Sequence, residues 1–91
     1  MDKEKARDVL VWYGYPNAQF DSQDGESIFY FRTVENRKGY VLKVVEIEDS
    51  IEIYQADEDY YEKYEIDFYY FDIDATFTKK QIDEYLSKNR I

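Results

Sequence analysis

The apolar positions at the start of the chain recur with the spacing of an α-helix. Within residues 2–13 they fall at i, i+3, i+4 and i+7, which predicts an N-terminal helix that Gly14 and Pro16 end. These positions are Ala6, Val9, Leu10 and Tyr13. Trp12 widens the apolar stripe beyond one face, so we expect its ring to lie in the core and not to serve as a ligand platform.

A second helical pattern closes the chain. Thr78 and Gln81 have the spacing of a capping box, in which each residue bonds the backbone N–H of the other. Apolar residues follow at helical spacing, at Ile82, Tyr85 and Leu86. We therefore predict a short C-terminal helix.

Between these helices the pattern changes to the two-residue alternation of β-strands. Residues 26–35, 40–48 and 51–55 predict three strands, joined by short turns at 36–39 and 49–50. The first two strands carry apolar residues on both faces, which is typical of central strands. The third has one apolar and one polar face.

Residues 64–77 predict a fourth strand whose alternation changes phase. A β-bulge near residues 69–71 would bring all of its acids to one side, whereas a regular strand would separate Asp72 and Asp74 from Glu65 and Asp67. Residues 56–63 fit either an open loop or one helical turn. Residues 14–25 are rich in turn-forming residues and predict a connecting loop.

The fold class that follows is α+β, with an N-terminal helix, a four-stranded antiparallel β-meander and a C-terminal helix. Ninety-one residues are too few for two independent cores, so we expect residues 1–91 to form a single domain. We expect the aromatic residues, 20% of the chain, to supply much of the buried area.

The composition excludes several kinds of function. The chain has no cysteine and no histidine, which removes disulfides, thiolate zinc sites, thiol nucleophiles and the commonest general base. The remaining catalytic candidates, the pair Asp72 and Asp74 or a lone Ser50, lack a cleft or a base. We therefore expect no enzyme, no cofactor and no metal, since the segment DEDYYE lacks the glycine and spacing of a calcium loop.

The chain also lacks an apolar run of the length that a signal peptide or a membrane span needs. We expect a cytoplasmic protein with no membrane partner.

The net charge of −9 is concentrated in one part of the sequence. Residues 46–74 hold twelve acids and one base, Lys63, whereas residues 1–45 are balanced and residues 75–91 sum to +2. Solubility requires a net charge of only about 2 to 8, mixed in sign, so it does not explain a block of one sign. Such a block repels itself and opposes folding.

This block predicts a partner-binding surface. Alternate residues on a strand lie about 6.7 Å apart, so acids on two adjacent strands would approximate the charge density of one DNA strand. Glu46, Glu48, Glu52, Glu65, Asp67, Asp72 and Asp74 are the candidates for such rows. The acids Asp57, Glu58, Asp59 and Glu62 extend them, and Tyr60, Tyr61 and Tyr64 are candidate interface anchors.

These features predict a small acidic protein, a monomer or weak dimer, that binds a basic protein and not nucleic acid itself. The leading interpretation is a nucleic-acid (DNA) mimic that blocks the basic groove of a nucleic-acid-binding enzyme. In size, acidity and lack of catalytic groups the chain is similar to the inhibitors that phages use to evade host defence, such as anti-CRISPR and anti-restriction proteins, and to glycosylase inhibitors. The likeness is one of character and not of motif.

Two alternatives remain open. The first is an immunity protein or antitoxin that neutralises a basic nuclease toxin, because acidic rows with tyrosine anchors suit it equally well. The second is a housekeeping interaction domain or a salt-adapted surface. Salt adaptation fits less well, since residues 1–45 are neutral and the chain keeps eight lysines.

Overall fold

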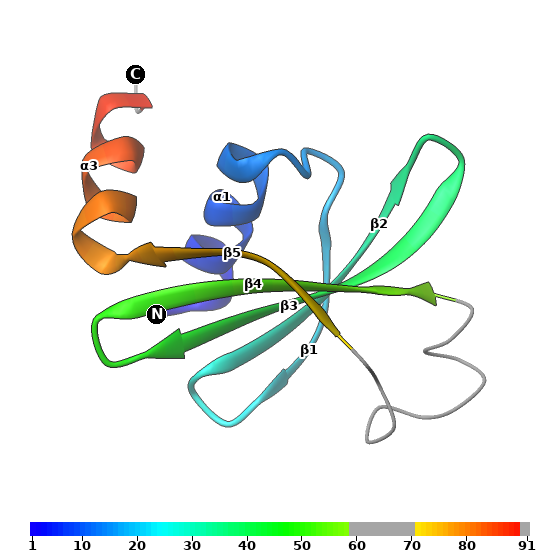
Figure 1. Ribbon diagram of the computed structural model, residues 1–91, viewed down its shortest axis with the longest axis horizontal. Helices are drawn as coiled ribbons and strands as arrows, with labels where there is room; N and C mark the ends of the chain where they lie inside the picture. The colour runs from blue at the N-terminus through cyan, green and yellow to red at the C-terminus, as the bar shows by residue number, and fades with distance from the viewer. Residues whose placement is uncertain (59–70, 90–91) are drawn as a thin grey trace.

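A computed structural model describes residues 1–58 and 71–89. In these residues the strands form one antiparallel sheet in chain order, and a helix lies at each end of the chain (Figure 1). The elements are α1 (Lys3–Tyr13), β1 (Gln19–Asp24), β2 (Ile28–Glu35), β3 (Lys38–Ile47), β4 (Ser50–Asp57), β5 (Asp72–Thr78) and α3 (Lys79–Asn89). The predicted α+β meander between two helices is confirmed, with five strands where the pattern predicted four.

The additional strand is β1, which falls within the segment predicted as a loop. All six of its residues are exposed, so its sequence, QFDSQD, has no apolar alternation. It is an edge strand that pairs with β2, and its register shifts between Phe20 and Ser22. This strand is held by backbone hydrogen bonds to β2 and has no buried face. The hydrophobic pattern therefore could not reveal it.

Both helices begin with a side-chain cap, of which the sequence predicted the one at the C-terminal helix. The Asp2 carboxylate accepts a hydrogen bond of 2.8 Å from the Lys5 N–H at the start of α1. Gly14 ends α1 with a φ of 140°, a value that favours glycine. Thr78 and Gln81 form the predicted capping box, with reciprocal bonds of 3.0 and 3.1 Å. Each such cap contributes about 1 kcal/mol.

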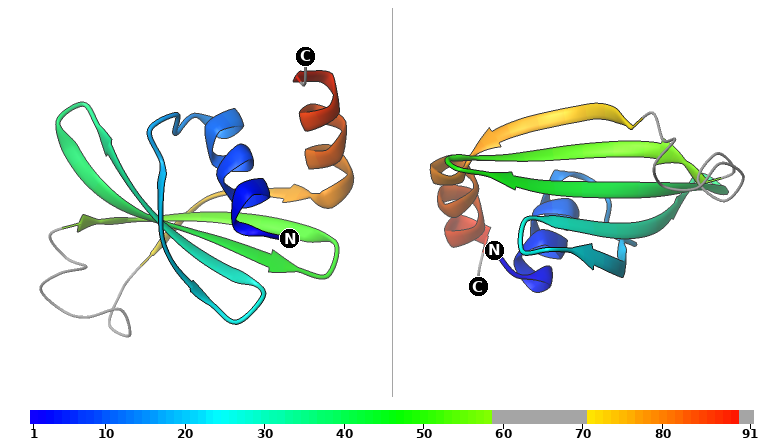
Figure 2. Two further views of the ribbon diagram at one scale, coloured as in Figure 1. Left: turned by 180° about the vertical axis from the view of Figure 1, so that it is seen from behind. Right: turned by 90° about the horizontal axis from the view of Figure 1, so that it is seen from below.

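Both helices lie on the same side of the sheet, which we call the helix-bearing face (Figure 2). The core fills the space between them and the sheet. Phe31 is paired with Leu42, and Val44 with Ile53, so apolar side chains of three strands meet on this face. The fully buried residues of this core are Ala6, Val9, Leu10, Ala18, Phe29, Phe31, Leu42, Val44, Ile51, Ile53 and Ile82. Each large side chain buried here stabilises the fold by about 1.5 to 3 kcal/mol.

The opposite side of the sheet, called the second face, carries a smaller apolar cluster. Tyr30 and Val41 point to this side and are buried. The Lys43 ammonium lies 4.6 Å from the centre of the Tyr54 ring and 4.5 Å from that of Phe71. The central strands therefore carry apolar side chains on both faces, as the sequence predicted.

Candidate protein-binding site

Half of the predicted partner-binding residues lie within the described part of the chain. The structure places Glu46, Glu48, Glu52, Asp57, Glu58, Asp72 and Asp74. Outside the described residues lie Asp59, Tyr60, Tyr61, Glu62, Tyr64, Glu65 and Asp67. Residues 56–63 were predicted as an open loop or one helical turn, which is wrong for Ala56 and Asp57 because they continue β4. Residues 59–63 and most of the bulge predicted at 69–71 also lie outside the described residues.

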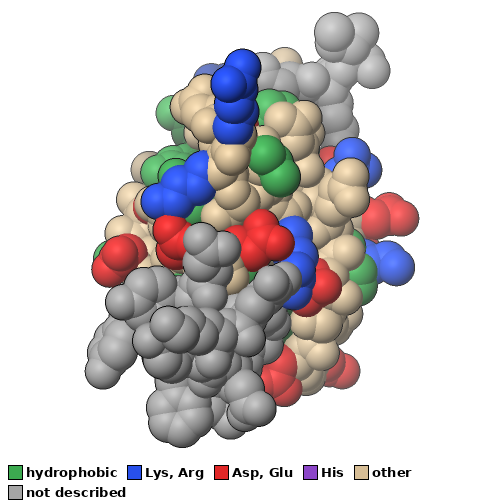
Figure 3. Space-filling view, turned by 90° about the vertical axis from the view of Figure 1, so that its right-hand side faces the viewer, with side chains coloured by type: hydrophobic (Ala, Val, Ile, Leu, Met, Phe, Trp, Pro, Cys, Tyr) green, Lys and Arg blue, Asp and Glu red, His purple; other side chains and the backbone are tan. Residues whose placement is uncertain are grey.

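The chain leaves and re-enters the sheet at the same end. β4 ends at Asp57, β5 begins at Asp72, and these strands are antiparallel neighbours in which Gln55 pairs with Asp72. Figure 3 looks at this end of the molecule, where acidic and basic side chains lie next to one another. The sheet thus brings together the two ends of the most acidic stretch of the sequence.

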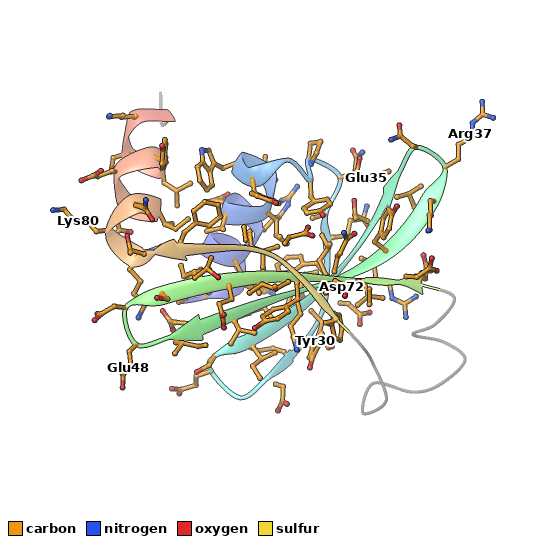
Figure 4. All side chains as sticks on the ribbon, in the orientation of Figure 1. Tyr30, Glu35, Arg37, Glu48, Asp72 and Lys80 are labelled. Atoms are coloured by element: carbon orange, nitrogen blue, oxygen red, sulfur yellow. The ribbon has the colours of Figure 1, made fainter. Side chains whose placement is uncertain are left out.

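The continuous acidic rows expected on adjacent strands are not formed by the described residues. The β3–β4 turn pairs Glu46 with Ile51 of the core, so Glu46 lies on the helix-bearing face. Glu52 pairs with Val45 and therefore lies on the second face. Figure 4 shows Glu48 at the β3–β4 turn, far from Asp72 at the start of β5. The register of the hairpin, which the sequence did not specify, separates these charges.

Three of the predicted acids that the structure describes form ion pairs within the chain. Glu46 is the most enclosed, with its carboxylate 3.1 Å from the N-terminal ammonium and 3.2 Å from Lys79 Nζ. Burial raises the pKa of Glu46, but the hydrogen bonds and charges of these two cations outweigh that effect and hold it below its ordinary value. Through these two ion pairs Glu46 of β3 joins the N-terminus, which precedes α1, to the start of α3.

The other two ion pairs stand at the end of β4. Lys38 Nζ lies 2.9 Å from the Asp57 carboxylate, and Arg32 Nη1 lies 3.4 Å from the Glu58 carboxylate. Glu58 also lies over Gly39, where an added Cβ would collide with its carboxylate. These ion pairs neutralise part of the negative charge that we expected to bind a basic partner.

Asp74 is the extra residue of a β-bulge in β5. Ile53 pairs with Ala75 and Tyr54 with Ile73, which leaves Asp74 without a partner in the ladder. Its carboxylate accepts hydrogen bonds from the Tyr15 hydroxyl and, at 3.1 Å, from Gln55 Nε2. The bulge re-aims Asp74 toward the loop that follows α1.

The charge of Asp74 helps to raise the pKa values of two neighbouring tyrosines. Burial, followed by the hydrogen bond to Asp74 and its charge, raises the pKa of the Tyr15 hydroxyl. Burial and the same charge raise the pKa of Tyr13, whose hydroxyl donates to the Asp74 carbonyl oxygen at 3.4 Å. Asp74 is thus part of the internal structure of this end of the sheet.

Of the candidate acids that the structure describes, most are partly buried. Glu48 and Asp72 are exposed. Glu52 is half-buried beside Tyr54, whose pKa is raised by burial and by the charge and hydrogen bond of Glu52. Among the described candidates, Asp72 is the exposed acid at the end where β4 and β5 meet the acid-rich segment.

Five rings that no sequence pattern predicted to lie together form a surface group, which we call the aromatic cluster. Trp12 stacks on Tyr85 with ring centres 4.7 Å apart and meets the edge of Phe77 at 4.9 Å. Tyr13 lies 5.8 Å from both Phe77 and Tyr15. Trp12 packs against the core as predicted but is only half-buried. No sequence signal indicated that α1 and α3 would lie side by side and join these rings.

Other kinds of site receive no support from the described residues. Within residues 1–58 and 71–89, no three acids are arranged to hold a metal ion. In the same ranges, no helix has the length and apolar character needed to cross a membrane. Comparisons with protein-family models, curated proteins and solved structures find no match to this chain.

Proposed function

We propose that this protein is an acidic inhibitor that occupies the basic groove of a nucleic-acid-binding enzyme as a mimic of DNA. The observation that carries the proposal is the distribution of charge, twelve acids and one base in residues 46–74. Ion pairs of Glu46, Asp57 and Glu58 with cations outside this stretch offset part of its excess charge. The repulsion that remains opposes the folding of a domain whose total stability is about 5 to 10 kcal/mol. A basic partner offsets that repulsion and gains rapid, electrostatically steered association.

The contacts of the described acids narrow the proposed surface. Glu46, Asp57, Glu58 and Asp74 are engaged within the chain. We therefore assign partner binding chiefly to Asp72 and to the acids of the segment between β4 and β5. Those segment acids are Asp59, Glu62, Glu65 and Asp67.

The proposal is tested by affinity capture from a host lysate with and without competing duplex DNA. We expect recovery of a basic nucleic-acid-binding enzyme that the DNA displaces. Recovery of a neutral protein that DNA leaves in place contradicts mimicry. Recovery of a nuclease toxin whose toxicity this chain suppresses on co-expression would assign the immunity-protein alternative instead.

A matched pair of variants distinguishes binding through the acids between β4 and β5 from binding through net charge alone. The segment variant carries Asp59→Asn, Glu62→Gln, Glu65→Gln and Asp67→Asn. The control variant carries Glu4→Gln, Asp8→Asn, Asp24→Asn and Glu84→Gln, four acids that are exposed on α1, β1 and α3. Both lose four charges, yet only the segment variant is expected to bind the partner much more weakly. Equal loss in both contradicts a localised site.

A further inference from the structure

The aromatic cluster is exposed to an extent that the fold alone does not require. Tyr85 is 44% exposed, Tyr13 is 36% exposed and the adjoining Val11 is 42% exposed. The rings come from three elements, α1, β5 and α3, and from the loop after α1. Tryptophan and tyrosine supply much of the binding energy at protein interfaces because they offer large areas at low cost in side-chain entropy. This surface therefore has the composition of a binding site.

The carboxylate of Asp74 borders the cluster on the side of β5. The Tyr15 hydroxyl donates to the Asp74 carboxylate, and the Tyr13 hydroxyl donates to the Asp74 backbone carbonyl oxygen. Asp72 is exposed two residues earlier on the same strand. Aromatic rings next to a carboxylate favour binding of arginine over binding of lysine. The planar guanidinium of arginine stacks on aromatic faces and pairs with carboxylates, whereas the lysine ammonium is compact and strongly hydrated.

We infer that the aromatic cluster is a second contact surface for the basic partner and that it selects arginine side chains over lysine. The inference rests on the proposed function, because it takes the partner to be basic. Charge complementarity favours this occupant, since the chain has a net charge of −9 and the Asp74 carboxylate accepts a hydrogen bond from Tyr15 of the cluster. A second copy of this chain would bring a further −9 to the same surface.

The probes are nona-arginine and nona-lysine peptides, which carry equal charge. We expect nona-arginine to bind about fivefold more tightly by calorimetry, as one or two stacked guanidinium groups would give. Trp12 is the single tryptophan, so its fluorescence reports directly on the cluster. Nona-arginine is expected to change that emission, and nona-lysine at equal occupancy to leave it unchanged.

Single-residue variants test which side chains produce the preference for nona-arginine. Tyr85→Ala and Tyr13→Ala are expected to reduce the arginine preference to near unity, while Tyr85→Phe keeps it because the ring remains. Val34→Ala is the control, since Val34 is 59% exposed on β2 and contributes no ring to the cluster. Thermal melting of each variant confirms that the fold is retained.

The outcomes separate this inference from the proposed function. Equal binding of both peptides with no response from Trp12 overturns the inference and leaves an acidic binding protein standing. Failure of both peptides to bind overturns the proposed function and the inference with it. Self-association in the absence of peptide that Tyr85→Ala abolishes would identify a second copy as the occupant and also overturn the inference.

Discussion

The carboxylate of Asp74 accepts a hydrogen bond from the hydroxyl of Tyr15, which precedes it by 59 residues in the chain. Gln55 on the neighbouring strand donates to the same carboxylate. Through these bonds the loop after α1 is tied to the bulge of β5. The acid-rich third of the sequence therefore contains acids of two kinds, those that hold the sheet together and those that face solvent.

The pair Asp74 and Asp72 tests this division. Asp74→Ala is expected to lower the free energy of unfolding by about 1 to 2 kcal/mol, because it leaves the Tyr15 hydroxyl and the Gln55 amide without their acceptor. Asp72→Ala is expected to change it by less than about 0.5 kcal/mol, because Asp72 is exposed. Urea denaturation measures both. A loss at Asp72 as large as at Asp74 would contradict the division.

Glu46 is expected to make the fold sensitive to acid. Its pKa is held below the ordinary value of 4.5, so its stabilising contribution is present above pH 4.5 and is lost as the pH falls through the lower folded value. Glu46→Gln is expected to cost about 2 kcal/mol at pH 7 and progressively less at acidic pH. Urea unfolding between pH 7 and pH 3 measures this. A cost that stays constant over that range would refute the assignment.

Tyr15 is expected to contribute at the opposite end of the pH scale. Its pKa is raised above the ordinary value of 10.0, so its contribution is present below pH 10 and is lost as the pH rises toward the folded value. The unfolding free energy of the unmodified protein should therefore fall more steeply above pH 10 than that of Tyr15→Phe. Parallel curves for the two proteins would show that Tyr15 is not responsible.

Ile82 is expected to fix α3 to the rest of the fold. It is fully buried, and Ile82→Ala is expected to cost about 2 to 4 kcal/mol. Ile73→Ala makes the same chemical change on β5 at a side chain that is 54% exposed, and is expected to cost less than about 1 kcal/mol. Thermal or urea unfolding compares the two. Equal losses would mean that burial of Ile82 does not hold α3 in place.

The sequence predicted the elements that have a buried face and missed the one that has none. Ala6, Leu10 and Ile82 recur at helical spacing because each helix turns them toward the sheet. β1 has only Phe20 as a large apolar residue and is held by its bonds to β2, so periodicity could not reveal it.

The candidate site was less predictable, because it depends on register and on contacts between distant residues. Glu46 and Glu52 look alike in the sequence, yet the β3–β4 turn puts them on opposite faces. Trp12 and Tyr85 belong to separate helical patterns, and only the packing of α1 against α3 stacks their rings. The number of acids in a stretch of the chain can be counted in the sequence. Which of those acids form ion pairs depends on residues far away in the chain, so it could not be predicted.

The most direct test of the central claim is the salt dependence of binding to the captured partner, measured by calorimetry between 50 and 500 mM salt, a range in which the Debye length falls from roughly 14 to 4 Å. We predict that affinity falls steeply with salt and that the segment variant loses most of this slope. The control variant, which lacks the same number of charges elsewhere, should keep it. An unchanged slope in the segment variant, or equal reduction in both, would contradict the account.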